Sequence, residues 1–260
     1  MKKYVLNMKV TENLRLHTNY CLLKLTTDEV LPEMLPGQFV NILVEGSSRT
    51  FLRRPISINY VDRKKNELWL LIQLIGDGTR QMAKSQVGDH LNMMLPLGNG
   101  FGIPENGLQD QKLLLIGGGV GTAPMLYLGA TLKEMGFESK FLLGARSKED
   151  LMQLDEFEKY GNVYITTEDG TLGEQGYVTD HSVLKETQFD KIFTCGPKPM
   201  MVAVARYANS QAINCEVSLE NTMACGIGAC LCCVEKTHKG NVCVCTEGPV
   251  FNIEKLTWLN

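Results

Sequence analysis

The sequence predicts a multidomain protein of the β plus α/β class, with an antiparallel β-barrel, a doubly wound α/β domain and a small C-terminal domain. Three observations support this prediction. Short apolar runs separated by turn residues fill the N-terminal part, buried strands then alternate with helices, and six of the nine cysteines lie between residues 225 and 245. A chain of 260 residues that is 44% hydrophobic can bury more than one core. We expect domains over residues 1–103, 104–214 and 215–260.

The N-terminal domain is predicted to consist of β-strands. Its apolar or alternating runs cover residues 4–10, 20–27, 39–44, 56–61, 67–75 and 90–95. Turn residues such as Pro36-Gly37 and Gly88-Asp89 separate the runs, and short strands at this spacing are typical of an antiparallel barrel or sandwich. One helix is predicted in this domain, over residues 80–85, entered from Gly78-Thr79.

Two stretches of this domain carry candidate binding groups. Arg53-Arg54-Pro55-Ile56-Ser57 places guanidinium and hydroxyl donors at the start of a strand, where they could hold a phosphate or the edge of a flavin. Gly76-Asp77-Gly78-Thr79 combines a glycine turn, a hydroxyl and a helix N-terminus, which together suit an anion. Each stretch also has a purely structural interpretation, as an arginine pair that guards a sheet edge or as a simple turn.

From Lys112 onward the sequence predicts alternating strands and helices. The predicted strands begin with LLLIGGG at residues 113–119 and continue at residues 140–144, 162–167 and 191–194. The predicted helices cover residues 122–136, 177–185 and 199–209, with a further helix capped by Ser147 and Asp150. Since strands that are apolar on both faces are typical of parallel sheets, we expect an open doubly wound sheet.

In such sheets ligands bind at the carboxyl ends of the strands, where this chain places a glycine loop and Cys195-Gly196-Pro197. The candidate residues of the loop are Gly117, Gly118, Gly119, Gly121 and Thr122. Pro124 stands where a dinucleotide G-x-G-x-x-G motif has its third glycine, so the loop itself predicts only a phosphate near a helix start. Cys195 is a candidate site residue, with a small buried thiol at a strand end as the alternative.

The cysteine-rich segment has the spacing of a 2Fe–2S ligand loop. Cys225, Cys230 and Cys233 follow C-x4-C-x2-C, and a fourth cysteine comes later in the chain. Gly226 and Gly228 have the conformational freedom to turn backbone N–H groups toward the sulfur atoms of such a cluster. The segment therefore predicts an iron–sulfur site.

Other interpretations of the cysteines are weaker. Zinc favours two C-x2-C pairs, whereas Cys243 and Cys245 form a C-x-C. Disulfides require an oxidising compartment, and the nine cysteines are odd in number. Spacing alone leaves Cys243 and Cys245 open as fourth ligand, because residues two apart on a strand point to the same face. Cys232 is not required in either case.

Composition excludes several functional classes. The net charge is −3, and no basic run interleaved with aromatic residues indicates a nucleic-acid partner. The N-terminal apolar run is interrupted at Asn7 and Lys9, which argues against a signal sequence, and no apolar stretch is long enough to cross a membrane. We expect a cytoplasmic protein, in which thiolates stay reduced for metal binding.

In combination, these motifs resemble the ferredoxin–NADP reductase superfamily, in which a β-barrel binds FAD and an α/β domain binds a nicotinamide nucleotide. Arg54-Pro55-Ile56-Ser57 is similar to its R-x-Y-S flavin motif, with Ile56 in place of the usual aromatic residue. Gly78-Thr79 is similar to its pyrophosphate turn, and the segment from Cys195 to Met200 to its C-G-P-x-x-M motif. The stretches LRRPISI, PLGNGF, MACGIGAC and VCTEGPVF resemble, more narrowly, the electron transfer subunits of type B, NAD-dependent dihydroorotate dehydrogenase.

This resemblance implies a function and partners. A catalytic subunit that holds FMN would oxidise dihydroorotate to orotate, and electrons would pass through the 2Fe–2S cluster and FAD of this chain to NAD⁺, in the biosynthesis of UMP. The family forms a heterotetramer of two subunits of each kind. Physical chemistry agrees, because nicotinamide exchanges two electrons, the cluster exchanges one, and a flavin can do either. The chain has no room for an FMN barrel of about 250 residues.

The resemblance also implies site residues. The FAD contacts that it implies are Arg54, Pro55, Ile56, Ser57, Leu71, Ile72, Gln73, Gly78 and Thr79. The cluster ligands that it implies are Cys225, Cys230, Cys233 and Cys245, with Cys245 preferred to Cys243 because it precedes the GPVF tail. The glycine loop and Thr122 would bind NAD, and Cys195 would lie on the nicotinamide side. Ile227, Leu231 and Val250 are expected to be available for contact with the partner.

Two alternatives stand beside this interpretation. The flavin and iron–sulfur subunit of an NADH-dependent ferredoxin–NADP oxidoreductase or sulfide dehydrogenase has the same modules, but usually a non-cysteine residue among its cluster ligands. A zinc-binding interaction protein is the alternative of another class. The choice between NAD and NADP is also open, because Arg146 follows the second strand of the α/β domain, where it could pair with a 2′-phosphate or simply be solvated.

Overall fold

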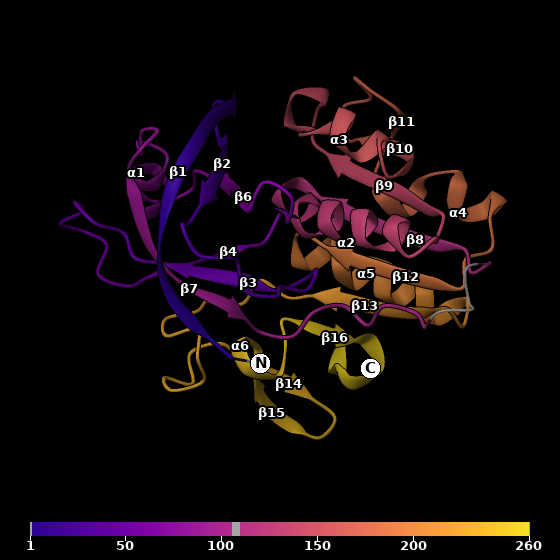
Figure 1. Ribbon diagram of the computed structural model, residues 1–260. Coiled ribbons are helices and arrows are strands. Elements are labelled where there is room, and N and C mark those ends of the chain that lie inside the picture. The colour runs from indigo at the N-terminus through magenta and orange to yellow at the C-terminus, as the bar shows by residue number, and fades with distance from the viewer. Residues whose placement is uncertain (1, 106–109, 260) are drawn as a thin grey trace. The chain divides into compact units, whose positions relative to one another are not determined.

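The computed structural model describes residues 2–105 and 110–259 (Figure 1). Contacts divide the chain into two compact units. The first consists of Met1–Gly100, Asn221–Glu235 and Val242–Pro249, and the second of Phe101–Glu220, Lys236–Asn241 and Val250–Asn260. Most of the cysteine-rich segment therefore packs in the same unit as the N-terminal strands.

The first unit is built on a seven-stranded antiparallel sheet that curls into a half-barrel (Figure 1). The strand order is β4-β3-β7-β1-β2-β6-β5, so that β4 and β5 form the two edges. The strands are β1 (Tyr4–His17), β2 (Tyr20–Thr26), β3 (Phe39–Ile42), β4 (Arg54–Ser57), β5 (Tyr60–Asp62), β6 (Glu67–Gln73) and β7 (His90–Leu97). The predicted antiparallel β-structure of the N-terminal part is confirmed.

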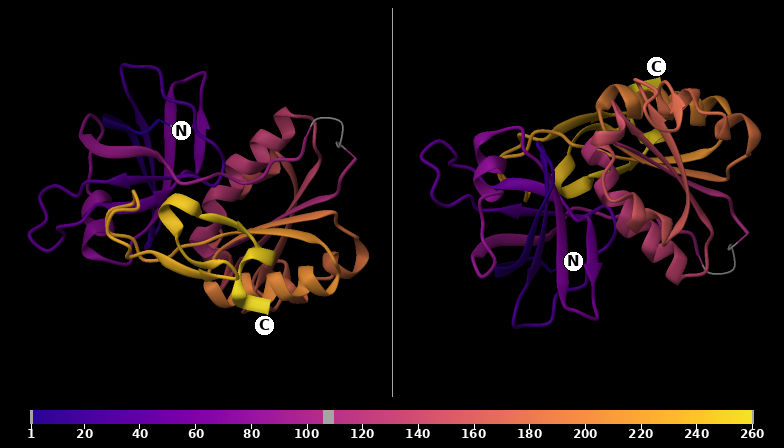
Figure 2. Two further views of the ribbon diagram at one scale, coloured as in Figure 1. Left: turned by 90° about the horizontal axis from the view of Figure 1, so that it is seen from below. Right: turned by 90° about the horizontal axis from the view of Figure 1, so that it is seen from above.

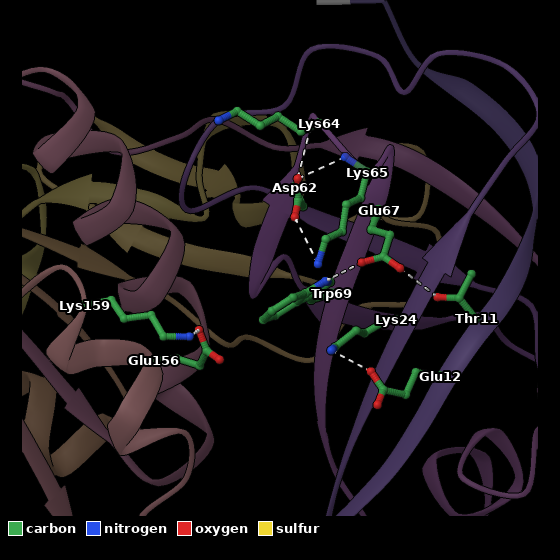
Figure 3. Close-up of polar contacts among 10 residues, drawn as sticks. All are labelled: Thr11, Glu12, Lys24, Asp62, Lys64, Lys65, Glu67, Trp69, Glu156 and Lys159. Atoms are coloured by element: carbon green, nitrogen blue, oxygen red, sulfur yellow. Dashed lines mark hydrogen bonds and ion pairs between the residues drawn. The ribbon is translucent and has the colours of Figure 1, made fainter.

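Polar side chains stabilise one side of the half-barrel around Trp69 (Figure 3). The indole Nε1–H donates to Glu67 at 3.3 Å, and Glu67 also accepts from the Thr11 hydroxyl at 3.2 Å. The ammonium of Lys24 lies 4.4 Å from the centre of a Trp69 ring and 2.5 Å from a Glu12 carboxylate oxygen. These contacts link strands β1, β2 and β6, which are neighbours in the sheet.

The helix predicted over residues 80–85 is wrong in its position, because α1 runs from Asp77 to Met82. The Thr79 hydroxyl accepts from the Gly76 N–H at 3.2 Å and donates to the Gly76 carbonyl at 3.1 Å. This local capping starts the helix before Gly78 instead of after Thr79. Gly78 and Thr79 consequently lie inside the first turn of the helix.

The second unit contains a seven-stranded sheet of order β11-β10-β9-β8-β12-β13-β16. Its strands are β8 (Leu113–Gly118), β9 (Ser139–Ala145), β10 (Gly161–Thr167), β11 (Glu174–Gln175), β12 (Lys191–Cys195), β13 (Asn214–Ser218) and β16 (Val250–Asn252). All pairings are parallel except that of β13 with β16. Figure 2 shows α2 (Ala123–Glu134) and α5 (Lys198–Ser210) on opposite faces of this sheet. The doubly wound prediction is confirmed.

Two predicted helices of this unit differ from the structure. The helix predicted over residues 177–185 is replaced by a 3₁₀ turn, Val178–Asp180, and the short helix α4 (Val183–Glu186). The Asp180 carboxylate accepts from the Tyr177 N–H at 2.8 Å, and Glu174 accepts from the Ser182 N–H at 2.8 Å. Such side-chain bonds to the backbone compete with a continuous helix.

The helix predicted to begin at Ser147 is likewise shorter and displaced. A 3₁₀ turn, Lys148–Asp150, follows Ser147 directly. The helix α3 (Leu154–Glu158) begins only after Gln153, whose φ is +58°. A residue in this left-handed conformation interrupts a helix, so the two pieces stay separate.

The C-terminal segment adds short elements that were not predicted. Strands β14 (Val234–Thr237) and β15 (Gly240–Cys243) form a two-stranded sheet, and the helix α6 (Val244–Glu247) follows. Two 3₁₀ turns, Ile253–Lys255 and Thr257–Leu259, close the chain. Across residues 2–105 and 110–259, we find no helix with the length and apolar character needed to cross a membrane.

Candidate functional site

The cysteine-rich segment from Cys225 to Cys245, here called the cysteine loop, directs backbone N–H groups at its own thiols. The N–H groups of Ile227 and Cys230 each donate to Cys225 Sγ at 3.4 Å. The N–H of Gly228 donates to Cys245 Sγ at 3.2 Å, and that of Cys245 donates to Cys233 Sγ at 3.4 Å. Donors of this kind stabilise the negative charge of thiolates that hold an iron–sulfur cluster, so the loop fits the predicted group.

The two glycines of this loop have conformations that favour glycine. The φ of Gly226 is +71° and that of Gly228 is +86°. A Cβ added at Gly228 would lie 2.7 Å from Thr246 Cγ2. The missing side chain therefore lets the first half of the loop approach the segment that carries Cys245.

Cys243 and Cys245 do not share a strand, contrary to the expectation that they would point to the same face. Strand β15 ends at Cys243, whereas Cys245 lies in α6. Cys245 is 1% exposed, and it is hydrogen-bonded to Gly228 through its Sγ and to Cys233 through its N–H. Cys243 is half-buried. Cys230 and Cys232 are exposed.

The pKa values of the thiols in this loop differ. Burial opposes ionisation of Cys225, but hydrogen bonds from the backbone of Ile227 and from Cys230 outweigh it and lower the pKa of the thiol to about 6. Burial raises the pKa of Cys245 to about 12, and the neighbouring Cys233 adds to the effect. Cys225 is thus ionised more readily than Cys245, and the thiolate is the form that binds a metal.

In the described part of the chain, no three His, Cys, Asp or Glu side chains converge in a way that would suit one metal ion. A 2Fe–2S cluster differs because its four ligands are divided between two irons.

The predicted flavin residues lie on β4, β6 and α1. The line along which β4 and β6 approach each other without pairing is here called the seam of the half-barrel. Arg54–Ser57 form the edge strand β4, and Cα atoms of β4 and β6 approach within 8 Å although the two strands are not paired. A Cβ added at Gly78 would lie 3.0 Å from Arg54 Nε. Arg54 therefore lies against the first turn of α1, as expected if both bind one ligand.

The three predicted residues on β6 lie on the other side of this seam. Leu71 and Ile72 are 2% and 0% exposed, so their side chains belong to the core. Strand β5 pairs with β6 only at Glu67–Trp69, where the Trp69 carbonyl accepts from the Asn59 N–H. Since backbone groups alternate in direction along a strand, Leu71 and Gln73 present theirs on the same side as Trp69. At Leu71 any contact with a ligand therefore involves the backbone, whereas Gln73 also has a half-buried side chain, whose Nε2 donates to the Tyr20 hydroxyl at 3.0 Å.

The glycine loop of the second unit packs closely against the segment from Cys195 to Met200. A Cβ added at Gly121 would lie 2.4 Å from Gly196 Cα and 2.5 Å from the Cys195 carbonyl oxygen. A Cβ added at Gly118 would lie 2.4 Å from Met200 Sδ. These glycines are therefore required for the contact between the two loops, whatever they bind.

Thr122 and Cys195 complete this end of the sheet. Thr122 donates to the Gly119 carbonyl at 3.0 Å and so closes the turn before α2. Cys195 is fully buried, and its Sγ lies 3.8 Å from Glu220 Oε1. Burial raises the pKa of the Cys195 thiol well above its usual value, and the nearby Glu220 carboxylate adds to this effect.

Comparison with known proteins decides the family. The chain is 38% identical over 250 residues to the electron transfer subunit of dihydroorotate dehydrogenase B (NAD(+)) of Fusobacterium nucleatum, covering 93% of this chain and 94% of that protein. It is 41% identical over 234 residues to the same subunit of Listeria monocytogenes, covering 88% and 90%. The chain belongs to the family of dihydroorotate dehydrogenase B electron transfer subunits.

Family models and solved structures agree with this membership. Residues 220–257 match the iron–sulfur cluster binding domain of dihydroorotate dehydrogenase B, and residues 115–206 match the oxidoreductase NAD-binding domain. A structure of NADH-dependent reduced ferredoxin-NADP oxidoreductase has a TM-score of 0.86 at 28% identity, covering 96% of this chain and 90% of that chain. The cytochrome P450 reductase GcoB of Amycolatopsis, with a TM-score of 0.68 at 23% identity and coverage of 80% and 66%, shares the fold.

As a member of this family, the chain is a flavin and iron–sulfur oxidoreductase subunit that uses FAD, an iron–sulfur cluster and NAD. The name of its relatives, electron transfer subunit, implies a catalytic partner subunit. Two residues near these sites were not predicted: Asn41, whose side-chain amide donates to the Cys225 carbonyl, and Glu220, whose carboxylate lies beside Cys195. The signal for Asn41 was present, because an amide interrupts the apolar run FVNILV. Glu220 had none, since only the fold brings it to Cys195.

The surface near the cysteines corrects one expectation. Ile227 and Leu231 are 40% and 66% exposed, as expected for contact residues. Val250 is 9% exposed and lies in β16, so it is not available for a partner. Val234, which is 41% exposed, was not predicted.

Proposed function

We propose that this chain passes electrons from a dihydroorotate dehydrogenase catalytic subunit containing FMN, through a 2Fe–2S cluster and FAD, to NAD⁺ in pyrimidine biosynthesis. The observation that carries the proposal is the cysteine loop, in which backbone N–H groups donate to three thiols. Its cysteines lie in the same compact unit as the antiparallel sheet that would bind FAD. The bound groups would supply the electron transfer, because a flavin can link one-electron and two-electron carriers. The chain's own residues position them.

The proposed cluster ligands are Cys225, Cys230, Cys233 and Cys245. The hydrogen bonds of the loop give three of these cysteines defined orientations, through Sγ acceptors on Cys225, Cys233 and Cys245. Cys230 takes part through its N–H, which donates to Cys225 Sγ. A loop organised in this way would need little rearrangement to bind the cluster.

The proposed FAD site lies along the seam between β4 and β6. Its residues are Arg54, Pro55, Ile56, Ser57, Leu71, Ile72, Gln73, Gly78 and Thr79. The Arg54 guanidinium suits a pyrophosphate, since it can donate charge-assisted hydrogen bonds. The backbone of Leu71 and Gln73 would face the ring edge. The Thr79 hydroxyl is engaged with Gly76, so its own role would be to shape the turn.

The proposed NAD site lies at the carboxyl ends of β8 and β12. Gly117, Gly118, Gly119, Gly121 and Thr122 would surround the nucleotide, with Cys195 on the nicotinamide side. The buried, protonated thiol of Cys195 would act by packing and weak hydrogen bonding and not as a nucleophile, because burial disfavours the thiolate.

The proposed assembly is a heterotetramer of two catalytic and two electron transfer subunits in the cytoplasm. Ile227, Leu231 and Val234 would contact the catalytic subunit, since all three are exposed apolar residues beside the ligand cysteines. We assign the functions to residues 1–103 for FAD, 104–214 for NAD and 215–260 for the cluster.

Reconstitution with the catalytic subunit tests the function. We expect the pair to reduce NAD⁺ with dihydroorotate, and this chain alone to pass electrons from NADH to a dye without oxidising dihydroorotate. A visible spectrum that lacks flavin and iron–sulfur bands would instead support the zinc alternative. Reduction of NADP⁺ by reduced ferredoxin, without dihydroorotate activity in the pair, would support the ferredoxin–NADP oxidoreductase alternative.

A further inference from the structure

Asn41 is a fully buried polar residue in the middle of β3, and it contacts the cysteine loop. Its exposed fraction is 0%, and its side-chain Nδ2 donates to the carbonyl oxygen of Cys225 at 3.1 Å. Its own carbonyl accepts from Arg53 Nη1 at 3.3 Å. The residue therefore joins the sheet to the peptide that follows the first predicted ligand.

The loop is shaped to receive this amide. A Cβ added at Gly226 would lie 2.8 Å from Asn41 Nδ2, and the next atom in its way would be Asn41 Cγ at 3.4 Å. Any side chain at residue 226 would therefore push the amide away from Cys225. The absence of a side chain at Gly226 and the amide of Asn41 are matched to each other.

Packing alone does not explain an asparagine here. Within the described residues, Asn41 Oδ1 is buried and has no hydrogen-bond partner. A buried acceptor without a partner destabilises the fold, and a leucine of similar size would fill the site without that cost. The useful feature of Asn41 is therefore its donor to Cys225.

We propose that Asn41 is a positioning residue for the iron–sulfur cluster. By holding the Cys225 carbonyl it also sets the direction of the Gly226 N–H, because the two groups of a trans peptide point in opposite directions. The next N–H, that of Ile227, donates to Cys225 Sγ. Donors to cluster sulfurs favour the reduced, more negative state and so raise the midpoint potential. The inference rests on the proposed assignment of Cys225 as a ligand.

The test uses the full chain with FAD and cluster bound. In Asn41→Leu we expect a more negative midpoint potential in a titration followed by electron paramagnetic resonance. We also expect the chelator concentration that removes half of the cluster to fall about tenfold, as when a residue that orients a metal ligand is lost. The matched control is Asn13→Leu, which removes amide donors to the carbonyls of Ala83 and Ser85 in the same unit, and should leave both values unchanged.

Two further variants, Asn41→Ala and Cys225→Ser, distinguish failure of the positioning role from failure of the ligand assignment. Asn41→Ala removes the same donor with a smaller side chain and must shift the potential in the same direction, with FAD content serving as the check on folding. A wild-type potential and chelator resistance in a folded Asn41 variant would overturn the positioning role alone. A full cluster in Cys225→Ser would overturn the ligand assignment on which it rests.

Discussion

The backbone N–H of Gly228 donates to the Sγ of Cys245 at 3.2 Å, across 17 residues of sequence. This bond joins the first half of the cysteine loop to the helix α6. It distinguishes Cys245 from Cys243, which ends β15 and is half-buried. The two candidates for the fourth ligand thus have different surroundings, although only one residue separates them.

The first prediction concerns that ligand. Cys245→Ser should lose the cluster, because it removes the thiol that the loop surrounds, whereas Cys243→Ser should keep it. Iron and acid-labile sulfide per chain are the measurement, and Cys232→Ser is the matched control in the same segment. Full cluster content in Cys245→Ser together with loss in Cys243→Ser would transfer the role to Cys243.

The second prediction concerns FAD. Arg54→Ala should weaken binding by about 1.5–3 kcal/mol, the usual value of a hydrogen bond to a charged group. This corresponds to a dissociation constant roughly 10- to 150-fold higher. Fluorescence titration of FAD into the flavin-free chain measures it, with the exposed Arg63→Ala as control. Wild-type affinity in Arg54→Ala would remove this residue from the site.

The third prediction concerns pH. After chelation of the cluster, Cys225 should be alkylated by iodoacetamide with a midpoint near pH 6, because its pKa is lowered to about 6 and the thiolate is present above that pH. Cys21 should resist at pH 8, since burial raises its pKa to about 11. Peptide mass spectrometry identifies the modified residue. Protection of Cys225 in the protein that keeps its cluster is the control, and equal labelling of both cysteines would contradict the prediction.

The fourth prediction concerns the glycine loop. Gly121→Ala should force the loop away from Cys195-Gly196, with a stability loss of about 1–3 kcal/mol, and should raise the KM for NADH in dye reduction while FAD stays bound. The control is Gly129→Ala, whose Cβ would lie 2.2 Å from Phe141 Cζ, in the same unit but in helix α2. It should destabilise without changing the KM for NADH. An equal change of KM in both variants would show that the loop acts only through stability.

Local patterns made much of the fold predictable. The apolar runs of the N-terminal part, the strands at β8 to β10 and the helix α5 depend on side-chain periods that a few neighbouring residues set. The same holds for C-x4-C-x2-C, because its spacing carries the chemistry of a cluster loop. The family resemblance followed from motifs of this kind, in their order along the chain.

Competition between local bonds decided the boundaries that were wrong. The Thr79 hydroxyl caps α1 early, and the Asp180 and Glu174 carboxylates interrupt the helix expected over residues 177–185. Thr, Asp and Glu side chains can cap a helix, form a turn or leave a helix uninterrupted. The outcome at each position depends on which backbone group lies within hydrogen-bonding distance.

Local sequence patterns were enough to predict the two large folds, the glycine loops and three of the proposed ligands. Only the tertiary structure placed β16 beside β13, brought Asn41 to Cys225 and Glu220 to Cys195, and separated Cys245 from Cys243. The reason is physical. A period or a spacing acts between near neighbours, whereas these contacts join residues far apart in the chain, and their energy exists only once the sheets have formed.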